Sequence, residues 1–242
     1  MKKLVQVISK PITLLILLLS LVALFTLRQA ISSRVYERRN SVVSSASIKH
    51  NKTVEQSLAY LKSKEKFVSY LYKCSAGAFT IGYGDTFFHR EFPQVKTITE
   101  KQASDRLQVK IEQSYAYLSK LKVEDATRKH NIAYTQFLNA QQLTALVSFI
   151  YNVGETGFSK STLKRLLDKK MQLYLSYTYP EQKAAPSKLS YLKQVNKLDK
   201  QIEGELKKWT HIKGKKKYEK LKGLEIRRAE EVSMLVWSKK LQ

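Results

Sequence analysis

The segment EKFVSYLYKCSAGAFTIGYGDT, residues 65–86, carries the fold signal from which the rest of the chain can be interpreted. Its second half places Gly77, Gly82 and Gly84 among β-branched and aromatic residues. Such a mixture is typical of short strands joined by tight turns. We therefore predict a small β-sheet lobe near residues 77–95.

The same segment spaces three groups that could act on a glycosidic bond. Glu65 precedes Cys74, the only cysteine, by nine residues and Thr80 by fifteen. Cleaving such a bond requires a carboxylic acid that protonates the leaving oxygen, and a second group that holds water or a nucleophile on the other face of the sugar. Because Phe67 and Val68 follow Glu65, we expect a partly apolar setting that suits an acid catalyst. A single Glu of this kind is more often a solvated surface residue. A catalytic role for Glu65 therefore depends on whether the surrounding sequence also fits such a site.

Helix signals flank the segment on both sides. Residues 53–56 and 99–102 have the capping-box pattern, in which a hydroxyl and an amide side chain satisfy free backbone N–H groups. The first box predicts a helix that runs toward Glu65. Asn139 predicts the cap of a third helix, which ends near Gly154 because Gly is common just past a helix end.

The carboxy-terminal half adds further amphipathic helices, predicted at residues 161–170 and 224–238. Between them, a Lys-, Tyr- and Gln-rich stretch at about residues 171–206 is predicted as an insertion of mixed helix and loop. The predicted fold class is α+β, mostly helical. The four His are scattered and there is one Cys, so we expect no disulfide within the chain, no metal and no cofactor.

An apolar run, PITLLILLLSLVALFTL at residues 11–27, follows a basic head. Its seventeen residues reach the lower limit for crossing a bilayer and exceed the usual apolar region of a secretory signal. We therefore predict an uncleaved membrane anchor, with cleavage near Ala30-Ile31-Ser32 as the alternative. Four positive charges flank the run on each side, so charge does not set the orientation. The predicted divisions are a head and anchor at residues 1–30, a polar tether at residues 31–52, and a folded domain at residues 53–242.

The formal charge of +24 favours contact with polyanions. Nucleic acid, a membrane surface, acidic wall polymers and the carboxylates of peptidoglycan peptides are all candidate partners. The alternative is that the lysines only solvate the helices. No nucleic-acid-reading motif accompanies the charge, so we predict no specific nucleic-acid partner.

The pattern of Glu65, Tyr72, Cys74, Gly77 and the TIGYG of residues 80–84 resembles the active-site region of phage-type lysozymes and endolysins, glycoside hydrolase family twenty-four. Three more landmarks follow in the same order as in that family. They are FLNAQQLTALVSFIYNVGETGFSKSTLKRLL at residues 137–167, Trp209, and GLEIRRAEEVSML at residues 223–235. The resemblance covers residues 53–238 and implies a lysozyme-like fold.

The resemblance assigns roles by position. Glu65 corresponds to the general acid, Cys74 to the slot in which many relatives carry an Asp that positions or activates water, and Thr80 to the residue that helps to hold that water. Many similar endolysins carry Cys in this slot, so the departure leaves the role of Cys74 open between a thiolate, a water-orienting group and a small buried hydrophobe.

The resemblance also points to residues outside the catalytic group. Tyr83, Asn152 and Gly154 are the substrate-binding residues that it implies. A second departure is Asp85, where relatives usually carry a His; we expect it to pair with a Lys or Arg and assign it no catalytic role.

The resulting hypothesis is a monomeric, membrane-tethered muramidase that hydrolyses the β-1,4 bond between N-acetylmuramic acid and N-acetylglucosamine in peptidoglycan, on the outer side of the cytoplasmic membrane, or secreted if the signal is cleaved. It resembles the signal-anchor endolysins. One alternative is a lytic transglycosylase, which cleaves the same bond without a water-activating carboxylate. Another is a non-catalytic basic protein that binds the wall or nucleic acid.

Overall fold

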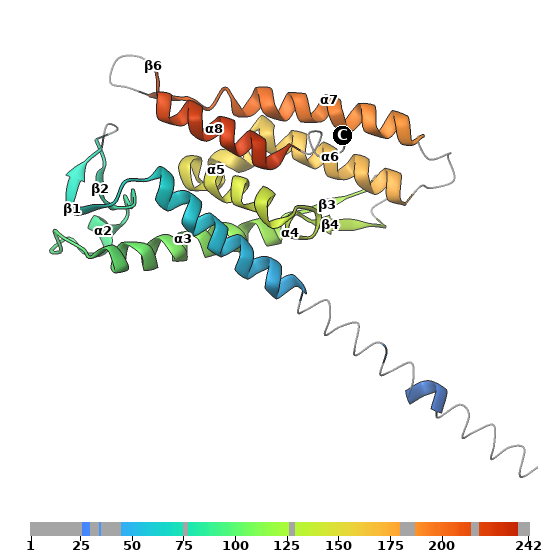
Figure 1. The fold of residues 1–242 in the computed structure, drawn as a ribbon, viewed down its shortest axis with the longest axis horizontal. Helices are drawn as coiled ribbons and strands as arrows, with labels where there is room; N and C mark the ends of the chain where they lie inside the picture. Colours follow the sequence, from blue (N-terminus) through green and yellow to red (C-terminus); the bar gives the residue numbers. More distant parts are fainter. Residues whose placement is uncertain are drawn as a thin grey trace, which may run out of the picture. The chain divides into compact units, whose positions relative to one another are not determined.

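A computed structural model describes most of the chain (Figure 1). The described residues are 26–29, 34, 45–74, 77–125, 129–179, 187–213 and 218–236. The chain divides into a unit of residues 1–48 and a compact unit of residues 49–242. Glu65 and all of its partners lie in the second unit.

The predicted anchor lies outside the described residues, apart from Thr26 and Leu27. Among the helices that are described, none combines the length and apolar character needed to cross a membrane. The anchor therefore stays a prediction.

The helix that leads to Glu65 is described from residue 45 to residue 64. The capping box predicted at residues 53–56 is wrong, because Thr53 lies inside this helix and its hydroxyl donates to the Lys49 carbonyl, 2.8 Å away. The helix therefore crosses the tether boundary that we predicted at residue 53. The helix itself runs toward Glu65 as predicted, and its apolar side chains Val54 and Leu61 are buried.

The β lobe contains strands β1 (Val68–Lys73) and β2 (Phe79–Gly82), paired antiparallel with Tyr72 opposite Thr80. Helix α2 (Phe88–Glu91) follows. The lobe therefore begins before the predicted range of 77–95, because VSYLYK forms its first strand.

The two other predicted helix caps are confirmed. Thr99 caps α3 (Glu100–Lys120), and Asn139 caps α5 (Ala140–Ser159), each in a reciprocal capping box with the Gln three residues later. Gly154 has a φ of 79° and interrupts α5, so the predicted break is also confirmed. Between α3 and α5 lie the remaining short elements of this half, β3 (Lys122–Glu124), β4 (Asn131–Ala133) and α4 (Tyr134–Phe137).

The carboxy-terminal half is more helical than predicted. Its elements are α6 (Thr162–Thr178), α7 (Lys188–Leu206), β5 (His211–Lys213), β6 (Tyr218–Lys220) and α8 (Lys222–Leu235). The described part of the predicted insertion is thus the end of α6 and the whole of α7. Lys170 of α6 and Asp199 of α7 join the two helices through a buried ion pair of 2.5 Å.

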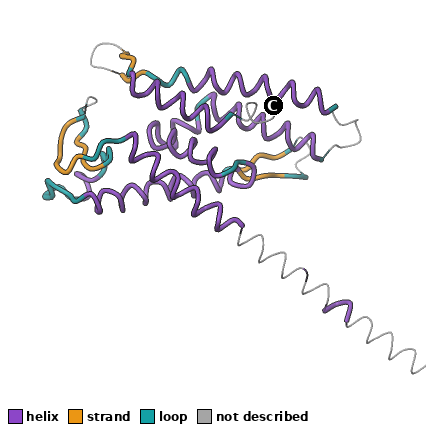
Figure 2. Tube along the Cα trace, viewed as in Figure 1, coloured by secondary structure: helices purple, strands orange, loops and turns teal. Residues whose placement is uncertain are grey.

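The core of the unit surrounds α5, whose residues from Leu143 to Ile150 are all buried. Helices α3, α6 and α8 pack against α5, and α7 packs against α6 and α8. Figure 2 shows the described strands as short pairs at the ends of the helices. This mostly helical arrangement, with small two-stranded sheets, places the β lobe beside the ends of α5 and α8.

Candidate active site

Glu65 is the first residue after the helix of residues 45–64, and its side chain is 25% exposed. Its Oε1 atom lies 2.5 Å from Nη1 of Arg227 in α8. On its other side, a Cβ atom added to Gly84 would lie 3.6 Å from Glu65 Oε2, an ordinary contact distance. Gly84 has a φ of 86°, so the left-handed backbone favours glycine at this position. The partly apolar setting that we expected is therefore wrong in one respect, since a cation contacts the carboxylate.

Arg227 is held by α5 as well as by Glu65. Its Nε atom donates to the Ser148 hydroxyl at 3.0 Å, and Nη2 donates to the Ser148 carbonyl at 3.1 Å. The Ser148 hydroxyl donates in turn to Glu231, at 2.6 Å. Only 6% of the Arg227 side chain and 1% of the Glu231 side chain are exposed. The guanidinium that contacts Glu65 is thus fixed from within the core.

Arg228 extends the same network away from Glu65. Its guanidinium pairs with Glu231, donates to the Trp209 carbonyl at 3.0 Å and also donates to Asn152. Burial lowers the pKa of Arg228, against the opposing effect of Glu231. Asn152, predicted to bind substrate, therefore uses its side-chain oxygen in a structural contact.

Cys74 directly follows β1 at the start of the turn, and Thr80 is the second residue of β2. The Cys74 N–H donates to the Ala78 carbonyl at 2.9 Å, and the Gly77 N–H donates to the Cys74 carbonyl at 2.8 Å. Thr80 is buried, and its hydroxyl donates to the Ala78 carbonyl at 3.1 Å. The hydroxyl oxygen of Thr80 can still accept a hydrogen bond from water.

Tyr72 lies in β1, opposite Thr80 in the sheet. Burial is the largest cause that raises the pKa of Tyr72, followed by the charges of Cys74 and Glu65. Cys74 directly follows β1, so Cys74 and Thr80 lie on adjacent parts of the same hairpin. The grouping of Glu65 with Cys74 and Thr80 stays a prediction.

The Tyr83 side chain is in the core, where its hydroxyl donates to Glu100 at 2.6 Å. Burial and this hydrogen bond raise the pKa of Tyr83 to about 12. The buried ring of Tyr83 is therefore not available to contact a substrate, and a role of Tyr83 in substrate binding would have to use its backbone. Its carbonyl lies nearer the site, because it accepts a 2.5 Å hydrogen bond from the Tyr151 hydroxyl.

A groove of about 290 Å³ adjoins this group of residues, and Gly84, Tyr151 and Gly154 are among those that line it. Glu65, Cys74 and Thr80 do not line this groove; it comes nearest to Glu65 at Gly84, where an added Cβ atom would lie 3.6 Å from both Glu65 Oε2 and the Tyr151 hydroxyl. Burial, followed by the charge of Glu65, raises the pKa of Tyr151. Phe87, which is 51% exposed, and Lys110 lie at the same groove, with Lys110 Nζ 4.6 Å from the centre of the Phe87 ring. The predicted role of Gly154 is consistent with this position.

Asp85 pairs with Arg106 at 2.6 Å, as predicted. Its other oxygen accepts the backbone N–H groups of Phe87 and Phe88. The side chain therefore holds the start of α2. Within the described residues, no group of three or more His, Cys, Asp or Glu side chains could hold a metal ion.

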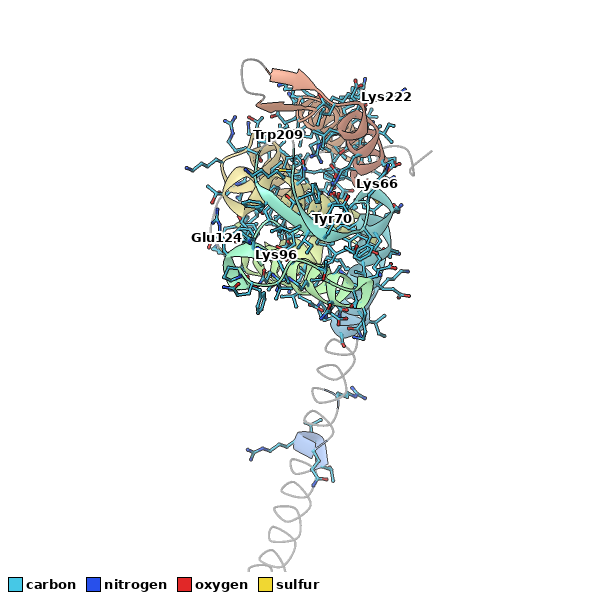
Figure 3. All side chains as sticks on the ribbon, turned by 90° about the vertical axis from the view of Figure 1, so that its left-hand side faces the viewer. Lys66, Tyr70, Lys96, Glu124, Trp209 and Lys222 are labelled. Atoms are coloured by element: carbon cyan, nitrogen blue, oxygen red, sulfur yellow. The ribbon has the colours of Figure 1, made fainter. Side chains whose placement is uncertain are left out.

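The exposed face of the β lobe is basic and aromatic. Figure 3 shows Lys66, Tyr70 and Lys96 on one face of the unit, with Trp209 and Lys222 above them. Tyr70 is 60% exposed. Sequence reasoning did not single out this face, because exposed Tyr and Lys residues carry no motif.

The Phage lysozyme family model matches residues 62–175. A 115-residue stretch of the chain is 31% identical to the endolysin of Acyrthosiphon pisum secondary endosymbiont phage 1, and it covers 47% of this chain and 68% of that endolysin. The chain belongs to the phage lysozyme family. As a member of this family it is a glycoside hydrolase, a muramidase that acts on peptidoglycan.

Solved structures give further matches for this phage lysozyme. The muramidase domain of SpmX from Asticaccaulis excentricus has a TM-score of 0.49 at 20% identity, with 75% of this chain and 95% of that chain covered. The endolysin from Escherichia coli O157:H7 phage FAHEc1 has a TM-score of 0.48 at 22% identity, with 74% and 90% covered.

Arg227, which contacts Glu65, is a residue that sequence reasoning quoted without assigning it a role. It lies in the GLEIRRAEEVSML segment. The paired arginines followed by a Glu were the available signal, because buried arginines in a helix require a carboxylate partner.

Proposed function

We propose that this phage lysozyme hydrolyses the β-1,4 bond between N-acetylmuramic acid and N-acetylglucosamine, with Glu65 as the general acid. The observation that carries the proposal is the setting of Glu65. One carboxylate oxygen is held by Arg227, while Gly84 and Tyr151 connect the residue to a groove. A carboxyl group fixed beside a groove can protonate the oxygen of a glycosidic bond that lies in it.

Cys74 and Thr80 are proposed to hold the attacking water. A thiol is mostly protonated at neutral pH and is then a poor base. We therefore assign Cys74 the orienting role, in which sulfur and the Thr80 hydroxyl fix the water rather than remove its proton. The hairpin supports this assignment, because Cys74 directly follows β1 and the buried Thr80 lies opposite Tyr72 near the same end of that strand.

The test compares the full chain with Glu65→Gln on insoluble peptidoglycan, with turbidity as the measurement. Glu55→Gln is the matched control, because Glu55 is an exposed carboxylate on the helix that leads to Glu65. We expect the wild type and the control to clear the suspension, and Glu65→Gln to leave it turbid. Clearing by Glu65→Gln at the wild-type rate would remove Glu65 from the mechanism.

The alternative of a lytic transglycosylase is favoured by one observation, the thiol of Cys74 in place of a carboxylate. The two reactions give products that differ by one water. Mass analysis of the released fragments separates them, and reducing ends are the outcome that hydrolysis predicts.

We further propose that the protein is a monomer held at the cytoplasmic membrane by residues 11–27, with the catalytic domain on the outer side. The apolar run behind a basic head supports the anchor, and the location of peptidoglycan supports the orientation. Membrane fractions treated with alkaline carbonate, together with the mass of the mature amino terminus, test this proposal. A soluble product that begins after Ala30 would show cleavage instead.

A further inference from the structure

Helix α7 carries three lysines on the face opposite its buried side. Lys193, Lys197 and Lys200 follow each other at four and three residues and are all exposed, whereas the core side of α7 contains Val195, Asp199, Ile202 and Leu206. Residues at this spacing lie on one face of a helix. We call Lys193, Lys197 and Lys200 the α7 lysine stripe.

No carboxylate of α7 is left to neutralise the stripe. Asp199 pairs with the buried Lys170, Glu203 pairs with Lys207, and Glu205 pairs with Lys208. In the part of the chain that the structure describes, the three stripe lysines have no ion-pair partner. Their charges therefore remain available to a ligand.

Polar side chains surround the stripe. A shallow hollow of about 460 Å³ is lined by the stripe lysines together with Asn196 and Gln201. The ammonium and amide groups are all hydrogen-bond donors that suit carboxylates. On the described face of α7, Leu189, four residues before Lys193, is the one large apolar side chain that is strongly exposed, at 64%. A helix that binds a bilayer surface presents apolar side chains to it, so this face fits a hydrated polyanion better than a membrane.

The stripe lies apart from Glu65. Helix α7 packs on α6 and α8, and both Figure 1 and Figure 3 show it along the edge of the compact unit opposite α3. Glu65 is held from α8 by Arg227, whereas the stripe faces solvent. A ligand on the stripe would therefore leave the groove beside Glu65 free.

We propose that the α7 lysine stripe is a second binding surface for the acidic peptides of peptidoglycan. Their carboxylates contact Lys193, Lys197 and Lys200, and the enzyme stays on the insoluble wall while the groove beside Glu65 takes the glycan strand. This inference rests on the proposed function, because it assumes that peptidoglycan is the substrate. Nucleic acid is the competing ligand, since lysines also contact phosphates without reading sequence.

The test measures co-sedimentation of the full chain with insoluble peptidoglycan from which covalently attached polymers have been stripped. Glu65→Gln serves as the background, so that the wall is not digested. The stripe variant replaces Lys193, Lys197 and Lys200 by Gln. The control variant replaces Lys120, Lys122 and Lys160 by Gln, because these lysines are exposed elsewhere and the change in charge is the same.

We expect the stripe variant to bind the wall roughly tenfold more weakly at low salt, since each exposed charge pair contributes a modest amount. The control variant should bind like its parent, and added salt should reduce the difference. With Glu65 restored, the stripe variant should clear insoluble wall more slowly but cleave short soluble glycans at the wild-type rate.

Equal weakening by the stripe and control variants would overturn the proposal, because it would show diffuse attraction without a site. Wall binding that is unchanged in the stripe variant, with loss of binding to duplex DNA, would assign the stripe to nucleic acid. Failure of the wild type to cleave soluble glycans would instead contradict the proposed function, whatever the binding result.

Discussion

At the scale of single residues, the site depends on which groups accept hydrogen bonds from the Arg227 guanidinium. Arg227 contacts Glu65 with one nitrogen and Ser148 with the two others. A lysine has one nitrogen on a flexible stem and cannot reproduce this planar arrangement. The contact therefore fixes the position of the Glu65 carboxylate as well as its electrostatic environment.

We predict that Arg227→Lys lowers the turnover of soluble glycans by roughly a hundredfold, because a small misplacement of a catalytic group has an effect of that order. Arg165→Lys is the control, since Arg165 is exposed and donates to Thr162. Kinetics on a short glycan, with circular dichroism to confirm folding, check the prediction. A folded Arg227→Lys with wild-type turnover would show that Glu65 needs no positioning by the guanidinium.

The orienting role assigned to Cys74 gives a second prediction. A serine hydroxyl can hydrogen-bond a water as a thiol does, whereas alanine cannot. We expect Cys74→Ser to keep most of the activity and Cys74→Ala to lose roughly tenfold or more, because the attacking water is then less well oriented. If both variants are fully active, Cys74 is only a small packed residue.

The raised pKa of Tyr83 predicts that the free energy of unfolding depends on pH. Its pKa is raised to about 12 from an ordinary value of about 10, so the folded protein favours the neutral phenol. The stabilisation is therefore complete below pH 10 and is lost as the pH rises through about 12. Urea unfolding across this range should show a fall in the free energy of unfolding that is smaller in Tyr83→Phe. Tyr70→Phe, which removes an exposed phenol, should follow the wild type.

At the scale of elements, two glycines provide a matched comparison. A Cβ atom at Gly154 or at Gly204 would meet no atom within 4 Å. Gly154 has a φ of 79° where α5 is interrupted, whereas Gly204 lies within α7. The two sites therefore differ in backbone conformation and not in available space.

We predict that Gly204→Ala raises the free energy of unfolding by about 1 kcal/mol, because alanine favours helix. Gly154→Ala should lower it by about 1 kcal/mol or more, because an L-residue is strained at this φ. Chemical denaturation of the two variants measures both values. Equal effects of the same sign would contradict the role of the backbone at Gly154.

Local sequence signals predicted some elements and missed others for physical reasons. The boxes at Thr99 and Asn139 cap helices because both reciprocal hydrogen bonds form. The pattern at Thr53 is identical in kind, but a helix that already runs from residue 45 supplies the same backbone contacts. The strand at residues 68–73 contains no Gly or Pro, the residues that mark turns. Its β-branched and aromatic residues alone do not distinguish a strand from the end of the preceding helix.

At the scale of the whole unit, one buried network joins stability to activity. Glu231 pairs with Arg228, accepts from Ser148 and lies 3.4 Å from Arg227. Two buried cations therefore share the Glu231 carboxylate, and Arg227 has Glu65 as a second partner. Removing one charge from such a group leaves the others without compensation.

We predict that Glu231→Gln lowers the free energy of unfolding by roughly 3 kcal/mol or more and also reduces activity, because Arg227 loses part of its support. Glu230→Gln is the neighbouring control. Glu230 pairs with Lys64 near the surface, so its loss should change stability by less than about 1 kcal/mol. Thermal unfolding and turnover are measured together; a stable but inactive Glu231→Gln would separate the two roles.

The long-range contacts are the part of the site that a single sequence could not provide. Glu65, Cys74 and Thr80 are close in sequence, and it is the resemblance to a known family that groups them in one predicted site. Arg227 reaches Glu65 across 162 positions, and the contact of Asn152 with Arg228 spans 76. Such pairings depend on how α5 and α8 pack. The spacing of apolar residues in one helix shows which face is buried, but it does not show which other helix packs against that face.

The helix before Glu65 has a mechanical consequence. Residues 49–64 of the compact unit form one uninterrupted helix, which at 1.5 Å per residue is about 24 Å long. Glu65 follows it directly, so the proposed general acid lies at the end of this helix. Because Val54 and Leu61 of the helix are buried in the core, the position of Glu65 is tied to helix packing over that whole length, and a change that loosens the helix at a distance from Glu65 would also displace the carboxylate.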